Sequence, residues 1–267
     1  MRFMNIAGYK FVSLEDLSGL RESFLQVTRE RHCKGTILLS KEGININLSA
    51  ESESVDEFKK FLQAYTCFQD ISFRVSYSLL QPFKFMRVKI KKEIITMHKE
   101  DIHPERQRAK SISPERLKQW LDENREMTLL DTRNEYEVRF GTFKKADHLH
   151  INDFSEFPQQ SQKINADKPV VMFCTGGIRC EKAALHMLDA GFSEVYQLEG
   201  GILNYFAEVG GDHYDGECFV FDQRISVDTQ LNETGTTQCH QCEGPIKKEM
   251  SMCSDVVCQK CIMKQSA

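Results

Sequence analysis

The stretch VVMFCTGGIRCEKAALHMLDAGF, residues 170–192, decides the fold of the central part of the chain. It opens with an apolar run, passes through a cysteine and two glycines, and ends in a helical pattern closed by Gly191. A short apolar run that leads through a turn into a helix indicates a buried strand of a parallel sheet. Ligands bind beyond the carboxyl ends of such strands, so Cys174 is expected where chemistry takes place.

The loop after this strand has the composition that stabilises a thiolate. Glycines adopt backbone angles that other residues avoid, so several peptide N–H groups can turn toward the Cys174 sulfur. The guanidinium of Arg179 and the positive end of a helix that starts near Cys180 add to this effect. The residues expected to form the backbone cradle are Thr175, Gly176, Gly177 and Ile178.

The sequence therefore predicts that Cys174 is a nucleophile aided by Arg179 and Cys180. Four residues separate Cys174 from Arg179, one fewer than in the loops of cysteine phosphatases, and the tighter loop favours a bound sulfur atom over a phosphate. Several roles stay open for Cys180: it can resolve an oxidised or persulfidated Cys174, tune it, be the principal thiol, or be an inert core residue.

The surrounding residues alternate between strand and helix patterns. Ser113 followed by Pro114 predicts a helix N-cap with proline at the first helical position. Apolar runs at 127–131, 170–174 and 195–198 predict strands, and helical patterns lie between and after them. This order predicts a parallel sheet that helices cover on both faces, over roughly residues 113–210.

The N-terminal part predicts a different, split βαβ fold. Strand patterns occur at 3–12, 35–40, 44–48, 71–77 and 85–95. Two helices fall between them, one after a capping box of Ser13 and Asp16 and one after a capping box of Ser54 and Glu57. The order β-α-β-β-α-β with one more strand is that of the ferredoxin-like fold.

Charge is distributed unevenly along a chain whose net charge is −4. From residue 84 to 110 there are nine Lys and Arg against four Asp and Glu, an excess of +5, so the remainder carries −9. Side chains of a strand alternate between its faces, so Arg87, Lys89 and Lys91 are expected to share one face at a spacing that suits a phosphate backbone. A nucleic-acid surface is one interpretation, and a solvated strand and linker is the other.

Composition limits the class of protein. The 267 residues are 40% hydrophobic, they contain no run of eighteen apolar residues, and the first residues lack the apolar region of a signal peptide. We therefore expect a cytoplasmic protein with no membrane partner. Ten cysteines without a signal peptide, five of them within the last 29 residues, favour metal binding or catalysis over a disulfide framework.

The tail has its own cysteine pattern. Cys239 and Cys242 form one CxxC, and Cys258 and Cys261 form another after fifteen intervening residues. This spacing is typical of zinc ribbons, in which four thiolates hold zinc tetrahedrally. Cys253 lies between the two pairs, so four of these five cysteines are the expected ligands. A redox-active or disordered tail is the alternative.

Motifs along nearly the whole chain resemble a known family. DTRNEYEVRFGTF at 131–143, CTGGIRCEKA at 174–183 and LEGGILNYF at 198–206 resemble the rhodanese module. Together with KEGIN at 41–45 and FVFDQR at 219–224, they resemble more narrowly the rhodanese-containing tRNA uridine hydroxylase family. The cysteine loop is the most specific of these motifs.

The resemblance implies a multidomain chain of α+β and α/β classes: a ferredoxin-like (acylphosphatase-like) domain at 1–97, a linker at 98–112, a rhodanese domain at 113–212 and a cysteine-rich segment at 213–267. It implies oxygen-dependent 5-hydroxylation of the wobble uridine of tRNA, with molecular oxygen as co-substrate and tRNA as partner. No flavin, haem or nicotinamide site and no HxD…H metal triad is evident.

The resemblance also carries expectations for single residues. Asp131 and Arg133 match the motif after the first rhodanese strand, where they would brace the active loop or serve architecture alone. Lys41 and Asn45 lie in the family-matching turn, and contacts with tRNA and an ordinary hairpin are equally compatible with it. In the tail the family pattern favours Cys239, Cys242, Cys253 and Cys258 as the metal-binding set.

Two other functions compete with the hydroxylase. A sulfurtransferase would carry a persulfide on Cys174 from thiosulfate to an acceptor, but it needs only the central domain and leaves the basic strand and the tail unexplained. A non-enzymatic, zinc-dependent RNA-binding adaptor would have a decayed rhodanese fold. The complete cysteine loop argues against such decay.

Overall fold

The computed structural model describes residues 2–247, 257–258 and 261–263. The chain divides into two compact units: residues 1–109 with 181–190, and residues 110–180 with 191–267. In the part of the chain that is described, no helix combines the length and the hydropathy that a membrane span requires.

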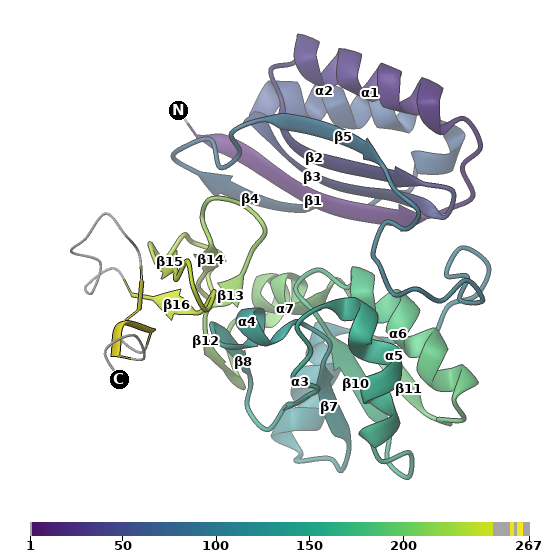
Figure 1. Ribbon diagram of the computed structural model, residues 1–267, viewed down its shortest axis with the longest axis vertical. Helices are drawn as coiled ribbons and strands as arrows, with labels where there is room; N and C mark the ends of the chain where they lie inside the picture. Colours follow the sequence, from purple (N-terminus) through teal and green to yellow (C-terminus); the bar gives the residue numbers. More distant parts are fainter. Residues whose placement is uncertain (1, 248–256, 259–260, 264–267) are drawn as a thin grey trace. The chain divides into compact units, whose positions relative to one another are not determined.

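The first unit contains the predicted split βαβ fold (Figure 1). Its elements are β1 (Phe3–Phe11), α1 (Leu17–Glu30), β2 (Lys34–Ser40), β3 (Gly43–Glu51), α2 (Ser52–Gln63), the 3-10 turn η1 (Thr66–Phe68), β4 (Arg74–Ser78) and β5 (Met86–Ile90). The strand order is β4-β1-β3-β2-β5. All neighbours are antiparallel except β2 and β5, which are parallel. The predicted ferredoxin-like order with one additional strand is confirmed.

Alternation along the strands builds the core of this unit. Ile37 and Leu39 of β2 and Ile44 and Ile46 of β3 are fully buried and point to one face of the sheet. Helices α1 and α2 cover that face (Figure 1). Phe24, which α1 contributes, packs among aromatic rings of α2 and η1. Burial of these side chains supplies the hydrophobic free energy that holds helices and sheet together.

Both predicted capping boxes in this unit are wrong in detail. The N-cap of α1 is Asp16, whose carboxylate accepts a hydrogen bond from the Gly19 N–H. Helix α2 begins at Ser52, directly after β3, and its N-cap is Glu51. The strand therefore turns into the helix without a loop, and the Ser54–Glu57 pair lies inside the helix.

The second unit contains a parallel sheet with the strand order β6-β11-β10-β7-β9, as the alternation of elements predicts. The elements from the linker to the sheet's last helix are, in chain order, β6 (Lys110–Ile112), α3 (Pro114–Asp122), β7 (Thr128–Asp131), α4 (Glu135–Val138), β8 (Gly141–Phe143), β9 (Asp147–His148), η2 (Phe154–Glu156), α5 (Phe157–Gln160), η3 (Ser161–Lys163), β10 (Val170–Phe173), α6 (Ile178–Asp189), β11 (Val195–Leu198) and α7 (Gly201–Val209). Of these, α6 begins in the second unit, and its residues from 181 onward are counted with the first. The Ser113 hydroxyl caps α3 by accepting from the Arg116 N–H, and Pro114 occupies the first turn, both as predicted.

Short antiparallel ladders follow the parallel sheet. They are formed by β12 (Tyr214–Gly216), β13 (Cys218–Phe219), β14 (Ser226–Val227), β15 (Thr237–Gln238) and β16 (Pro245–Ile246). β12 pairs with β8, while β13 pairs with β14 and β15 with β16. These strands are two or three residues long, so they leave no periodic pattern in the sequence.

Candidate functional site

The cysteine loop lies at the carboxyl edge of the parallel sheet. Cys174 follows the last residue of β10, a strand that has β7 on one side and β11 on the other. Helix α6 begins four residues later, at Ile178. The fold thus places the thiol where ligands bind in open α/β sheets.

Backbone N–H groups surround the Cys174 sulfur. The Gly177 N–H donates to Sγ over 3.1 Å, and Gly177 adopts the left-handed φ of +95° that turns this N–H inward. Burial raises the pKa of Cys174, but a hydrogen bond from Cys180, the charge of Arg179 and the backbone N–H groups of Arg179 and Gly177 outweigh it and lower the pKa to about 5. The thiolate therefore predominates at neutral pH.

Cys180 has the opposite character. Burial and the neighbouring Cys174 thiolate raise its pKa well above the ordinary value. Its Sγ also lies 3.6 Å from the Thr132 hydroxyl, and that hydroxyl in turn donates to the Phe173 carbonyl over 3.0 Å. The geometry supports Cys180 as a protonated hydrogen-bond donor that stabilises the thiolate of Cys174.

The Arg179 side chain forms a buried, two-pronged ion pair with Glu137. Nη1 and Nη2 lie 2.5 and 2.7 Å from the two carboxylate oxygens, and both side chains are almost completely buried. The Phe221 ring lies 5.8 Å from the guanidinium carbon. Sequence reasoning missed Glu137, although Asn134 and Glu137 have the spacing of a capping box and the Glu137 carboxylate accepts a hydrogen bond from the Asn134 N–H over 3.2 Å.

Asp131 and Arg133 form a second buried ion pair, between Nη2 and Oδ2 at 2.7 Å. Nη2 also donates to the Gly141 carbonyl, and the Thr142 hydroxyl donates to the Asp131 carboxylate. These contacts tie the end of β7 to β8. They are consistent with a supporting role for Asp131 and Arg133.

The start of α7 packs directly against the loop. The Ile202 N–H donates to the Cys174 carbonyl over 2.9 Å, and the Leu203 N–H donates to the Thr175 carbonyl over 3.1 Å. A Cβ atom on Gly201 would lie 2.3 Å from the Cys174 oxygen, so only glycine allows this approach. The Thr175 hydroxyl donates to the Phe219 carbonyl, which links the FVFDQR motif to the loop.

The RNA-binding candidates lie on the first unit and differ in exposure. Arg87 and Lys89 are exposed on β5, and Lys91 is exposed just beyond the end of that strand, which is shorter than predicted. Lys41 is exposed in the turn between β2 and β3. Asn45 is partly buried and donates to the Ile94 carbonyl over 3.3 Å, so its amide has a structural contact.

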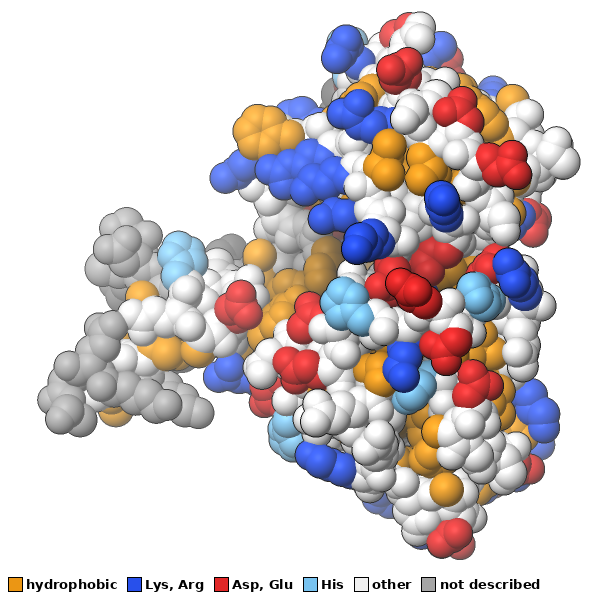
Figure 2. Space-filling model, turned by 45° about the vertical axis from the view of Figure 1, so that its right-hand side comes forward, with side chains coloured by type: hydrophobic (Ala, Val, Ile, Leu, Met, Phe, Trp, Pro, Cys, Tyr) orange, Lys and Arg blue, Asp and Glu red, His pale blue; other side chains and the backbone are white. Residues whose placement is uncertain are grey.

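An exposed aromatic ring accompanies the basic side chains of β5. Phe85 is 65% exposed, and the Arg87 guanidinium carbon lies 5.9 Å from its ring centroid. Figure 2 shows Lys and Arg side chains gathered beside hydrophobic ones in the upper part of the view, which is the first unit. Basic groups with an open aromatic face suit single-stranded RNA.

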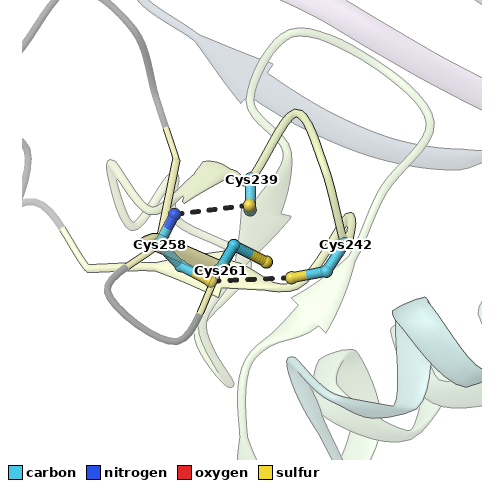
Figure 3. Close-up of side chains that lie close together, drawn as sticks. All are labelled: Cys239, Cys242, Cys258 and Cys261. Carbon is cyan, nitrogen blue, oxygen red and sulfur yellow. Dashed lines mark hydrogen bonds between the residues drawn. The ribbon is translucent and has the colours of Figure 1, made fainter. Parts of the chain in front are cut away.

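Four tail cysteines converge from two segments (Figure 3). The sulfur atoms of Cys239, Cys242, Cys258 and Cys261 all lie within 4.8 Å of one another. The Cys258 N–H donates to the Cys239 sulfur over 3.3 Å. Cys253, the remaining candidate, lies outside the described residues.

The cluster is attached to the short helix α4. The Arg139 guanidinium, at the C-cap of α4, donates to the Cys242 carbonyl over 2.8 Å and lies 3.7 Å from the Cys242 sulfur. Glu137, the partner of Arg179, belongs to the same helix. Arg139 therefore links the cysteine cluster to the helix that carries Glu137.

Comparison with known proteins gives matches along nearly the whole chain. Residues 3–94 match the model of the UPF0176 acylphosphatase like domain, residues 113–208 that of the Rhodanese-like domain, and residues 215–265 that of the Rhodanase C-terminal domain. These matches confirm the predicted fold classes.

Full-length relatives carry a common name. The chain is 49% identical over 257 residues to the tRNA uridine(34) hydroxylase of Cupriavidus pinatubonensis, covering 93% of this chain and 91% of that protein. It is 47% identical over 265 residues to the tRNA uridine(34) hydroxylase of Ralstonia nicotianae, covering 96% and 94%. The crystal structure of a rhodanese-related protein from Thermoplasma volcanium is 25% identical, with a TM-score of 0.33, and covers 38% of this chain and 93% of that one.

Proposed function

The chain belongs to the tRNA uridine(34) hydroxylase family, and we propose that it hydroxylates the wobble uridine of tRNA at C5 with dioxygen as co-substrate. The observation that carries the proposal is the buried thiolate of Cys174 in its cradle of N–H groups, within a chain that matches these hydroxylases over more than nine tenths of its length. A tRNA substrate agrees with an enzyme of the cytoplasm, where thiols stay reduced.

The cradle supports covalent activation of the base. Addition of the Cys174 thiolate to C6 of uridine forms an S–C6 bond and moves the electron pair of the C5–C6 double bond to C5, which becomes nucleophilic. After a C5–O bond forms, loss of the C5 proton and departure of the thiolate from C6 restore the double bond. One oxygen atom enters the base and the other leaves as water, so an external reductant must supply two electrons.

Arg179 and Cys180 are proposed to stabilise the Cys174 thiolate before it adds to C6 and when it leaves C6. The Cys180 thiol donates a hydrogen bond to Cys174 and so stabilises the departing anion. The Arg179 charge acts through space, because both terminal nitrogens of its guanidinium are held by Glu137. Cys174 is fully buried, so the loop or its cover must open to admit the base.

Nucleoside mass spectrometry of tRNA tests this function. In cells that lack the gene, we expect 5-hydroxyuridine-derived wobble nucleosides to disappear and to return with the wild-type protein but not with Cys174→Ala. Cys67→Ala is the matched control, since Cys67 belongs to η1 of the first unit and the cysteine loop belongs to the second. Full restoration by Cys174→Ala would overturn the thiolate mechanism. Thiosulfate turnover without any change in tRNA would favour a sulfurtransferase.

For tRNA binding we propose the surface formed by Phe85, Arg87, Lys89 and Lys91, together with Lys41. Its support is the exposure of five side chains that offer positive charge and one aromatic face. Such surfaces hold the phosphate backbone through the charges and stack unpaired bases on the ring. Asn45 contributes less to this proposal, because its amide already contacts Ile94.

For the tail we propose a structural zinc ion held by Cys239, Cys242, Cys258 and Cys261. The support is the convergence of four sulfur atoms with a spacing that closes a tetrahedral thiolate site. Metal analysis of the purified chain should give one zinc per chain, lost in Cys242→Ser and retained in Cys253→Ser. Loss of zinc in Cys253→Ser instead would support the family's Cys-x4-Cys pattern.

A further inference from the structure

A second cluster of metal-ligand residues lies in the rhodanese-like unit. Glu135 is the first residue of α4, His148 is the last residue of β9, and His150 follows two residues later. Nδ1 of His150 lies 2.9 Å from the Glu135 Oε2, and Nδ1 of His148 lies 3.4 Å from the same oxygen. One donor atom from each residue lies within 4.8 Å of the others.

Two of the three donor–donor distances are those of ligands that share one ion, although the shorter one, from Nδ1 of His150 to Oε2 of Glu135, is also that of a hydrogen bond. Two ligand atoms about 2.1 Å from a transition-metal ion lie about 3.0 Å apart at a right angle and about 3.4 Å apart at the tetrahedral angle. The observed distances of 2.9 and 3.4 Å match these values. The three side chains would therefore need little movement to bind an ion.

The backbone holds the three residues in place. The Glu135 N–H donates to the Ile151 carbonyl over 2.7 Å, which fastens the start of α4 to the segment that carries the histidines. His150 adopts the left-handed φ of +52°, unusual for a residue with a side chain, and this turns the chain after His148. Nδ1 of His148 is buried and makes no hydrogen bond, while the exposed His150 keeps the cluster open to solvent.

The topology brings this cluster to the same sheet edge as the cysteine loop. β9, β7 and β10 are parallel neighbours in the sheet. His148, Glu135 and Cys174 lie at or just after the carboxyl ends of these three strands. The cluster and Cys174 therefore share the edge at which open α/β sheets bind ligands.

From this arrangement we propose that Glu135, His148 and His150 bind a divalent first-row transition-metal ion. Two imidazoles and one carboxylate form the donor set with which proteins hold ferrous iron while other coordination positions stay open. The imidazole and carboxylate donors of this site differ from the four thiolates of the tail cluster, whose soft ligands favour zinc. The two sites are therefore expected to prefer different metal ions. The proposal does not depend on the hydroxylase function, since it concerns ion binding alone.

Cobalt titration of the full-length, zinc-loaded protein under anaerobic conditions tests the site. We expect one Co²⁺ per chain to bind with visible absorption bands but without thiolate-to-cobalt charge transfer, because the donors are nitrogen and oxygen. His148→Ala, His150→Ala and Glu135→Gln should each weaken binding by more than about 10-fold. His98→Ala is the matched control, because His98 is another exposed histidine beside a glutamate, Glu93, and it should leave binding unchanged.

The His150 side chain is exposed, so His150→Ala removes a proposed ligand without disturbing the core. This variant is therefore expected to fold. Circular dichroism should show that His150→Ala has the wild-type fold. Wild-type Co²⁺ affinity in folded His150→Ala, absorption bands with thiolate charge transfer only, or equal losses in His98→Ala would each overturn the proposal. Ferrous iron titrated in the same way should compete with Co²⁺ for the site.

Discussion

At the scale of single residues, the proposed chemistry depends on which of two neighbouring thiols, Cys174 or Cys180, carries the charge. Both Cys174 and Cys180 are fully buried, and burial alone would keep both protonated. Only Cys174 accepts the Gly177 N–H, whereas Cys180 donates to Cys174 and faces Thr132. The environment thus assigns the thiolate to Cys174 and the proton to Cys180.

The ionisation of Cys174 should follow this assignment. Because the pKa is lowered to about 5, the thiolate is present above that pH and is lost as the pH falls through it. The ultraviolet thiolate absorbance of wild type minus Cys174→Ser, measured against pH, should have its midpoint near 5. In Cys180→Ala the midpoint should move upward, since a hydrogen-bond donor to the thiolate is lost. A midpoint near the ordinary cysteine pKa in the wild-type protein would show that the loop does not stabilise the Cys174 thiolate.

The Arg179–Glu137 pair should matter for stability because it is buried. Glu137→Gln leaves a buried guanidinium without its counter-ion, and we expect a loss of about 3–5 kcal/mol in the free energy of unfolding. Glu57→Gln is the control: Glu57 forms a partly exposed pair with Arg31 at 2.9 Å, and its loss should cost less than about 1 kcal/mol. Denaturant titration measures both. Equal losses of unfolding free energy in Glu137→Gln and Glu57→Gln would show that burial of the Arg179–Glu137 pair does not increase its effect on stability.

At this scale the sequence alone predicted the position of Cys174 but not the residues that surround it. A thiol between a buried strand and a glycine turn has a local signature. The Arg179 contact with Glu137 joins residues 42 positions apart, and no local pattern specifies that pairing. The same holds for Glu135 with His148 and His150, because the carboxylate precedes both histidines along the chain, whereas it lies between them in an HxD…H motif.

At the scale of elements, the loop depends on how closely α7 approaches it. Gly201→Ala would place a methyl group 2.3 Å from the Cys174 carbonyl oxygen at a φ of +67°, so α7 must retreat and the loop must shift. Gly176→Ala is the matched control within the loop, since a Cβ there meets no atom within 4 Å. We expect Gly201→Ala to lose most hydroxylation and at least about 1 kcal/mol of stability.

Gly176→Ala should retain both properties, and nucleoside mass spectrometry with thermal melting compares the two variants. Similar losses in both would mean that the approach of α7 is not what shapes the loop.

Elements with a long periodic pattern were predictable, and short ones were not. Helix α7 and the strands of the first unit have apolar residues at regular spacing, so their positions follow from the sequence. β10 is short, but it was predictable because its four residues form a continuous apolar run that leads into the glycine turn. β6 and β9 have three and two residues, and pairing with neighbours of the parallel sheet defines them. Helix α2 was misplaced at its start because the strand before it ends without a turn signal.

At the scale of the whole molecule, the proposed tRNA-binding surface and the proposed thiolate site belong to one chain. Sequence motifs identified the family, because they lie in both the N-terminal and the central parts of the chain. Composition did not reveal hydroxylation, since the thiolate cradle serves a persulfide or a base adduct equally well. The substrate therefore follows from the relatives, and the geometry supports how the thiol acts.

Charge on β5 should appear as salt dependence of tRNA binding. Replacing Arg87 or Lys89 by alanine removes one phosphate contact, so the slope of log affinity against log salt should fall by roughly 1 for each. Phe85→Ala should weaken binding with little change in that slope, because stacking releases no counter-ions. Filter binding of tRNA over a range of salt concentrations separates the two effects, and unchanged slopes in both basic variants would contradict the proposed surface.

The central claim is that Cys174 directs an oxygen atom from dioxygen onto the wobble uridine. Its most direct test is to grow cells that depend on this protein under isotopically heavy dioxygen and to weigh the wobble nucleosides of their tRNA. We expect one heavy oxygen atom per hydroxylated wobble uridine with the wild-type protein and none with Cys174→Ala. A hydroxyl group that carries oxygen from water, or heavy oxygen incorporated equally by Cys174→Ala, would contradict it.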